Sequence, residues 1–207
     1  WQSVVVKALR NEWFDGVKGY NSMLLSTEFY DLFSAYDYIL IYQLDAYVFR
    51  NELDEWVAKG YDYIGAPWII KRGLSYYLFG GWMQALHRKL HPIGEGENMV
   101  HAHLAFSVGN GGLSLRRVSK MREMAEQFAD EISRLRFGEE RRAAEDVFFS
   151  LVAGRRCGLK KPGWREALAF AWESKPDYCM HTIGKLPFGC HAWSLPRYKS
   201  FWKQYIK

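Results

Sequence analysis

The sequence has few of the features that define disulfide-bonded and zinc-stabilised proteins. Its 207 residues include only three cysteines, Cys157, Cys179 and Cys190, and no two of them stand in a C-x-x-C spacing. An odd number of cysteines without paired spacing argues against a disulfide framework and against a structural zinc site. A reducing, cytoplasmic location is therefore the prediction.

Long apolar runs are also missing. No stretch approaches the roughly 20 consecutive apolar residues that a membrane span requires, and no charged-then-apolar leader opens the chain. We expect no transmembrane span, although the aromatic segment 74–86, with basic residues on both sides, permits a peripheral membrane contact. The chain starts at Trp1 and enters an apolar run at once, which suggests that an upstream strand is missing.

Two common phosphate-binding loops are absent. The sequence contains neither G-x-G-x-x-G nor a glycine-rich loop ending in Gly-Lys-Ser/Thr. The net charge of +5 would suit an anionic partner, but the basic residues lie in scattered pairs and do not follow one helix. This distribution argues against a helix that reads DNA, and we predict no nucleic-acid partner.

Aromatic residues, in contrast, are abundant. They make up 17% of the chain and include nine tryptophans, three of them directly after glycine or proline. Most aromatics in any domain belong to the core. Aromatic rings in loops, next to polar groups, are also how proteins hold sugar rings.

The apolar run 38–44 indicates a central strand, because a strand covered on both faces presents no polar side chain to water. Asp45 follows where this strand ends, which is where ligands bind in open α/β sheets. The alternative is that Asp45 caps a turn or pairs with a surface arginine. A helix at 53–59 and a second strand at 61–66 complete a rhythm that predicts an α/β domain with a largely parallel sheet.

The remaining elements fit one domain over 1–207 with an inserted segment at 71–105. Patterning predicts a short strand at 4–6 and helices at 20–33 and 119–135. Gly109, Gly111 and Gly112 surround Asn110 between two apolar runs, which indicates a turn whose backbone closely approaches another group or adopts positive φ. A plain hairpin is the alternative.

Two adjacent acids, Glu145 and Asp146, begin the next helix. The helix dipole favours acids at this position without any function. Only one is needed there, however, and the residues that follow are fully apolar, so a carboxylate at this edge of the core can serve as a general base. His191 lies in a glycine-containing turn among aromatics, where a histidine usually has a structural role.

Five motifs, taken in chain order, resemble a microbial domain family related to the GT-A type glycosyltransferases. They read Q-L-D-A at 43–46, Y-D-Y-I-G-A-P-W at 61–68, G-N-G-G-x-S-L-R at 109–116, E-D-V-F-F at 145–149 and F-G-x-H-x-W at 188–193. The resemblance covers most of the chain, from about Tyr20 to Trp193. It implies a Rossmann-like GT-A fold, mostly parallel, that moves a sugar from a nucleotide-sugar donor to a glycan or lipid-linked acceptor, in surface polysaccharide or glycoconjugate synthesis.

The same resemblance implies roles for individual residues. Asp45 and His191 would hold a divalent cation, Mn²⁺ or Mg²⁺, although Gln43 replaces the first acid of the Asp-x-Asp motif. Donor contacts would come from Gln43, Asp45, Asn110, Gly111 and Gly112, the catalytic acids would be Asp146 and Glu145, and Trp68 and Trp193 would wall the pocket. The alternative function is a carbohydrate-binding module without catalysis, which would have no use for the acid pair.

Overall fold

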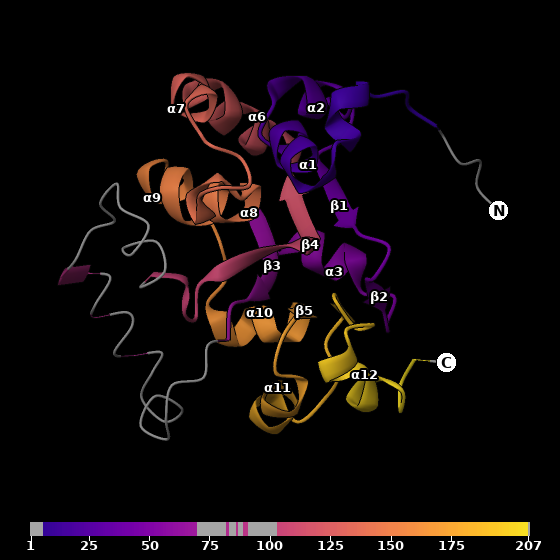
Figure 1. Ribbon diagram of the computed structural model, residues 1–207. Helices are drawn as coiled ribbons and strands as arrows, with labels where there is room; N and C mark the ends of the chain where they lie inside the picture. Colours follow the sequence, from indigo (N-terminus) through magenta and orange to yellow (C-terminus); the bar gives the residue numbers. More distant parts are fainter. Residues whose placement is uncertain (1–5, 70–81, 83–85, 87–88, 91–102, 207) are drawn as a thin grey trace.

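A computed structural model describes residues 6–69, 82, 86, 89–90 and 103–206 (Figure 1). The predicted inserted segment 71–105 lies mostly outside these described residues, and so does most of the strand predicted at 4–6. None of the described helices is long and apolar enough to cross a membrane. All three cysteines are free, as their spacing predicts.

The strands form two small sheets of three strands each, and the predicted Rossmann-like GT-A fold with a mostly parallel central sheet is wrong. The first sheet has the order β1-β4-β3, and both of its pairings are antiparallel. The second has the order β2-β6-β5, in which only β5 and β6 run parallel. The strand bounds are β1 Tyr38–Tyr42, β2 Tyr47–Val48, β3 Tyr63–Pro67, β4 Val108–Arg117, β5 Ala171–Trp172 and β6 Gly189–Cys190.

Strand β1, predicted to be central, lies at the edge of its sheet. Its apolar sequence nevertheless has the predicted cause, because its two faces pack against two separate core clusters. Ile39 and Ile41 contact the cluster around Leu24 and Met121, whereas Tyr38 and Leu40 contact the cluster around Trp56. An apolar run therefore reports cover on the faces of a strand and does not reveal whether a neighbour pairs with each edge.

The glycine-rich segment predicted as a turn is part of strand β4, the longest strand described. Its second half, Leu113–Arg117, pairs with β1 in continuous register, while its pairing with β3 shifts register after Gly65. Glycine is required here for close approach, because a Cβ on Gly65 would collide with the carbonyl oxygen of Asn110. The expectation of a closely approached backbone thus holds, although the turn does not.

Both long predicted helices are interrupted. The helix predicted at 20–33 divides into α1 (Gly16–Leu24) and α2 (Thr27–Asp31), because the Ser26 hydroxyl accepts a hydrogen bond from the Phe29 N–H and caps a new helix. The helix predicted at 119–135 divides into α6 (Val118–Gln127) and α7 (Ala129–Ser133). Periodicity detects the shared apolar face but not the break.

Other helical predictions are confirmed. Helix α3 (Leu53–Ala58) precedes Gly60, whose φ of +67° is the left-handed conformation expected there. A helix begins at Glu145 as α8 (Glu145–Val147) and continues as the π-helical turn η3 (Phe148–Ala153). The remaining helical segments are η1 Asn11–Phe14, η2 Arg141–Ala143, α9 Gly154–Arg156, α10 Trp164–Phe170, α11 Pro176–Ile183 and α12 Pro196–Trp202.

The helices gather at opposite ends of the sheets. Helices α1, α2, α6 and α7 lie together above the first sheet in Figure 1, and α10, α11 and α12 lie below it. Many of the tryptophans are buried between these layers, among them Trp13, Trp56, Trp68, Trp172 and Trp202. The interpretation that most aromatics are core residues is therefore supported.

Candidate functional site

Sheet β2-β6-β5 brings three functional side chains to one of its edges. Glu173 directly follows β5 and His191 directly follows β6, and these strands are parallel, so both residues emerge at the same edge. Strand β2 runs antiparallel to β6 with Tyr47 opposite Cys190, so Asp45, just before β2, reaches this edge as well. The backbone N–H of His191 donates to the Trp172 carbonyl and fixes the geometry.

His191 lies between two carboxylates. Its Nε2 is 3.1 Å from Oδ1 of Asp45, and its Nδ1 is 4.0 Å from Oε1 of Glu173. The Nδ1 atom is buried and has no hydrogen-bond partner within the described structure. Burial raises the pKa of Glu173, while His191, Arg141 and the side chain of Asn110 act to lower it. The imidazole thus joins two acids at the edge of the sheet.

The cluster packs against the glycine segment of β4. A Cβ on Gly112 would overlap the imidazole ring of His191, so only glycine permits the ring to lie on the strand. The carbonyl of Gly112 accepts a hydrogen bond of 3.0 Å from the backbone N–H of Gln43, which holds the loop carrying Asp45 against β4. The two sheets therefore meet at this glycine.

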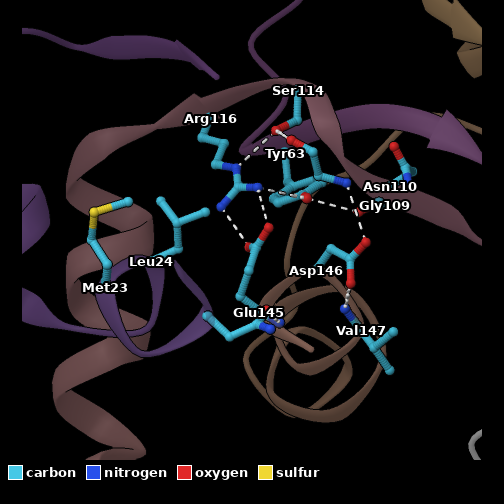
Figure 2. A network of polar contacts seen from close by, with 12 residues as sticks. Met23, Leu24, Tyr63, Gly109, Asn110, Ser114, Arg116, Glu145, Asp146 and Val147 are labelled. Atoms are coloured by element: carbon cyan, nitrogen blue, oxygen red, sulfur yellow. Dashed lines mark hydrogen bonds and ion pairs between the residues drawn. The ribbon is translucent and has the colours of Figure 1, made fainter. Parts of the chain in front are cut away.

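Asp146 reaches the neighbouring glycine from the start of helix α8 (Figure 2). Its Oδ2 accepts a hydrogen bond of 3.2 Å from the N–H of Gly111, and its Oδ1 accepts one of 2.7 Å from the N–H of Val147. The side chain of Asn110 accepts a hydrogen bond from the N–H of Gly112. Asp45, Asp146 and His191, far apart in sequence, thus converge on the segment Asn110–Gly112.

The protonation of Asp146 is strongly perturbed. Burial raises the pKa of its carboxyl to about 7, assisted by the negative charges of Glu145 and Glu173 and opposed by Arg141 and the Val147 N–H. A carboxyl group whose pKa lies near neutrality exchanges protons readily at physiological pH. This is the property that a general base requires.

Glu145, the other acid of the pair, is held in a closed ion pair. Its carboxylate accepts two hydrogen bonds from Arg116, of 2.7 Å from Nη1 and 2.9 Å from Nη2, and both side chains are fully buried (Figure 2). The Nε of Arg116 donates to Ser114, and its remaining donors reach the hydroxyls of Tyr30 and Tyr63. All five guanidinium N–H donors therefore have acceptors.

The predicted pocket tryptophans lie elsewhere in the packing. Trp68 belongs to a buried cluster with Leu104, Val147 and Leu151, and its ring tip lies next to Gly109. Trp193 is half-buried at the border of the cluster around Trp172. Among the described residues, no hydrogen bond or ring contact joins either tryptophan to Asp45 or Asp146, and their role as pocket walls stays a prediction.

An apolar groove of about 700 Å³ adjoins the site at Gln43 and Asp45. Its walls come from η1, α1, α2 and the edge of β1, and the residues lining it are Leu9, Trp13, Phe14, Tyr20, Met23, Leu24, Phe29 and the segment Leu40–Asp45. The acidic edge therefore continues directly into an apolar surface.

A family model described as "Protein of unknown function (DUF5672)" matches residues 3–191. The chain belongs to this family. The match includes all the residues that converge on Asn110–Gly112, from Asp45 to His191. No curated protein and no solved structure gave a match.

The donor set of this family member is compatible with a divalent cation shared with a substrate. Among the described residues, no three His, Cys, Asp or Glu side chains form a ready metal site. Asp45 and His191 offer two ligands whose donor atoms are 3.1 Å apart, close to the roughly 3 Å between neighbouring ligands of an octahedral ion with bonds of about 2.1 Å. Mg²⁺ commonly takes its other ligands from water and phosphate oxygens.

Sequence reasoning gave no role to two residues that belong to the site, Glu173 and Arg141. Glu173 carries the signal that selected Asp45, a carboxylate beside a short apolar strand, but strand β5 is only two residues long and escapes a periodicity search. The positive charge of Arg141 acts on both Asp146 and Glu173. Nothing in the local sequence distinguishes this arginine from its neighbour Arg142.

Proposed function

We propose that this chain is a glycosyltransferase that moves a sugar from a nucleotide-sugar donor to a hydroxyl acceptor, with Asp146 as the general base. The observation that carries the proposal is the convergence of Asp146, whose pKa is about 7, with Asp45 and His191 on the glycine segment of β4. The motif resemblance favours the same reaction class.

Proton transfer falls to Asp146. Its two oxygens accept backbone hydrogen bonds that fix the plane of the carboxylate, and the burial that raises its pKa also makes it a stronger base once ionised. As the acceptor oxygen bonds to the anomeric carbon, its proton passes to Asp146. The bond from that carbon to the diphosphate breaks, and the electron pair leaves with the diphosphate.

Charge neutralisation is the second requirement. The site presents the carboxylates of Asp45, Asp146 and Glu173, so an anionic diphosphate needs positive charge to approach them. A divalent cation held by Asp45 and His191 supplies that charge when it is bound. Arg141, whose charge acts on Asp146 and Glu173, adds to it from the chain itself.

Glu145 has a different part in this proposal. Because its carboxylate is committed to Arg116, it is a positioning residue that holds the start of α8, and hence Asp146, against Gly111. Asn21 supports the same position, since its side chain accepts a hydrogen bond of 2.8 Å from the Glu145 N–H. Of the two catalytic acids predicted from the sequence, this proposal therefore keeps only Asp146 in the catalytic role.

The test is donor turnover by the purified chain. A panel of nucleotide sugars with Mn²⁺ or Mg²⁺ is incubated with and without saccharide acceptors, and release of nucleoside diphosphate is measured. We expect release with at least one donor, and Asp146→Asn should lower the rate by about 100-fold or more, as loss of a general base does. Asp130→Asn, an exposed acid on α7, is the matched control and should keep full activity.

Two results would refute the proposal. One is near-normal turnover by Asp146→Asn, which would remove this carboxylate from the reaction. The other is saturable sugar binding with no release of nucleoside diphosphate from any donor, which would identify a carbohydrate-binding module.

A further inference from the structure

Among the residues that the structure describes, strand β1 has one edge without a neighbouring strand. Its hydrogen bonds to β4 begin with the Val118 N–H donating to the Asp37 carbonyl and end with the Gln43 N–H donating to Gly112. In an antiparallel ladder the inward-facing residues alternate, so the backbone groups of Tyr38, Leu40 and Tyr42 point away from β4. No strand among the described residues pairs with them.

The apolar groove follows this same edge. It is lined by the consecutive residues Leu40, Ile41 and Tyr42 of this edge strand. Its opposite wall is formed by η1 and α1. Large apolar side chains stand in water around it, with Phe14 69% exposed and Leu44 fully exposed.

The sequence of β1 gives no protection against pairing. Edge strands usually carry a charge, a proline or a bulge that prevents association, and Tyr38–Tyr42 has none of these. The strand is also a palindrome, Y-I-L-I-Y, centred on Leu40. When two copies pair antiparallel about Leu40, tyrosine therefore lies opposite tyrosine and isoleucine opposite isoleucine.

We propose that β1 pairs with β1 of a second copy of this chain, antiparallel across a twofold axis at Leu40. This register places Leu40 opposite its own copy and Tyr38 opposite Tyr42 of the second copy. The outward-facing backbone groups of both strands then satisfy one another. Continued past the strand, the register also sets the exposed Leu44 opposite the exposed Tyr36 of the second copy.

A lipid chain is a weaker occupant of the groove. An acyl chain would cover the apolar walls but would leave the backbone N–H and C=O groups of Tyr38, Leu40 and Tyr42 buried without partners, which is costly. A strand satisfies the same groups while it covers the same walls. The open edge therefore favours a strand, and the palindrome favours a second copy.

The experiment is sedimentation velocity on the purified chain and on two charge variants. We expect a dimer at protein concentrations up to about 100 μM, a range that detects Kd values of that order. Leu40→Lys and Leu40→Glu each place like charges opposite one another at the axis and should raise Kd at least tenfold. Mixing the two variants places opposite charges there and should restore a heterodimer.

The controls separate loss of pairing from loss of folding. Circular dichroism should show that both Leu40 variants remain folded, and Tyr205→Lys, an exposed aromatic far along the chain, should leave the dimer unchanged. Restoration on mixing cannot arise from misfolded chains. A monomeric wild-type chain at all concentrations, or a dimer that both variants leave intact, would overturn the proposal.

Discussion

Two neighbouring acids, Glu145 and Asp146, lie in opposite electrostatic surroundings. Glu145 faces a buried arginine whose five N–H donors all have acceptors, so its charge is balanced within the fold. Asp146 faces other acids and receives only two backbone N–H donors, and burial raises its pKa to about 7. Adjacent positions in the chain thus belong to two different regions, a closed ion-pair network and an open acidic edge.

The difference separates a structural acid from a reactive one. A buried carboxylate that is fully paired with a guanidinium fixes the backbone and is committed to that partner. A buried charge with incomplete partners is costly to the fold and available for chemistry. The closed network around Arg116 therefore supports the acidic edge beside it, and the predictions below test each half of this comparison.

The largest expected effect comes from breaking the closed network. Arg116→Met leaves Glu145 buried without its cation, and we expect the free energy of unfolding to fall by about 5 kcal/mol, the upper range for a broken buried pair. Urea denaturation measures the change.

The double variant Arg116→Met with Glu145→Met is the matched comparison. It removes both charges, so it should be more stable than Arg116→Met alone by 1 kcal/mol or more, roughly as replaced buried pairs behave. Equal stabilities of the single and double variants would show that the remaining Glu145 charge is tolerated, and the network would not be closed as described.

The second prediction concerns Asp146 at the acidic edge and its effect on how stability depends on pH. Because the pKa of Asp146 rises from 3.8 to about 7 on folding, the native state holds a proton that the unfolded state has lost between pH 4 and 7. The free energy of unfolding should therefore decrease as pH rises through this window, by up to about 4 kcal/mol from this group.

Asp146→Asn removes the titrating group and with it this decrease. The free energy of unfolding should change less between pH 4.5 and 7.5 for the variant than for the wild type. Subtracting one change from the other removes the contribution of the titrating groups that both proteins share. If both proteins show the same pH dependence, folding does not raise the pKa of Asp146, and its assignment to the acidic edge fails.

The sequence located the two adjacent acids, but it did not show that one is paired and the other is not. The pattern of an acid pair before an apolar run located the start of α8 correctly. The partner that distinguishes the two acids is Arg116, and it lies 29 positions earlier, on another element. Local spacing cannot show which of two adjacent acids such a distant guanidinium will reach.

The predicted fold is wrong, whereas the roles predicted for the site residues stay predictions. Asp45, Asn110, Asp146 and His191 converge as the motifs suggested, whereas the parallel sheet inferred from strand-helix-strand order does not exist. Sequence order specifies which elements follow one another, but strand β4 inserts between β1 and β3 from 41 positions beyond β3. Such long-range pairing leaves no trace in local periodicity.

The smallest expected effect compares two acids at the ends of β1. Asp37 precedes the strand, and Asp45 follows it beside His191. Asp45→Asn keeps an oxygen near the His191 Nε2 but removes a charge that a divalent cation needs, so Mn²⁺-dependent binding of a nucleotide-sugar donor should weaken by about tenfold, or roughly 1.4 kcal/mol. Calorimetric titration with and without Mn²⁺ measures it, and Asp37→Asn, an exposed acid at the opposite end, should bind as the wild type does. Equal weakening in both variants would assign the effect to general surface charge, and the distinction between the acidic edge and the rest of the strand would disappear.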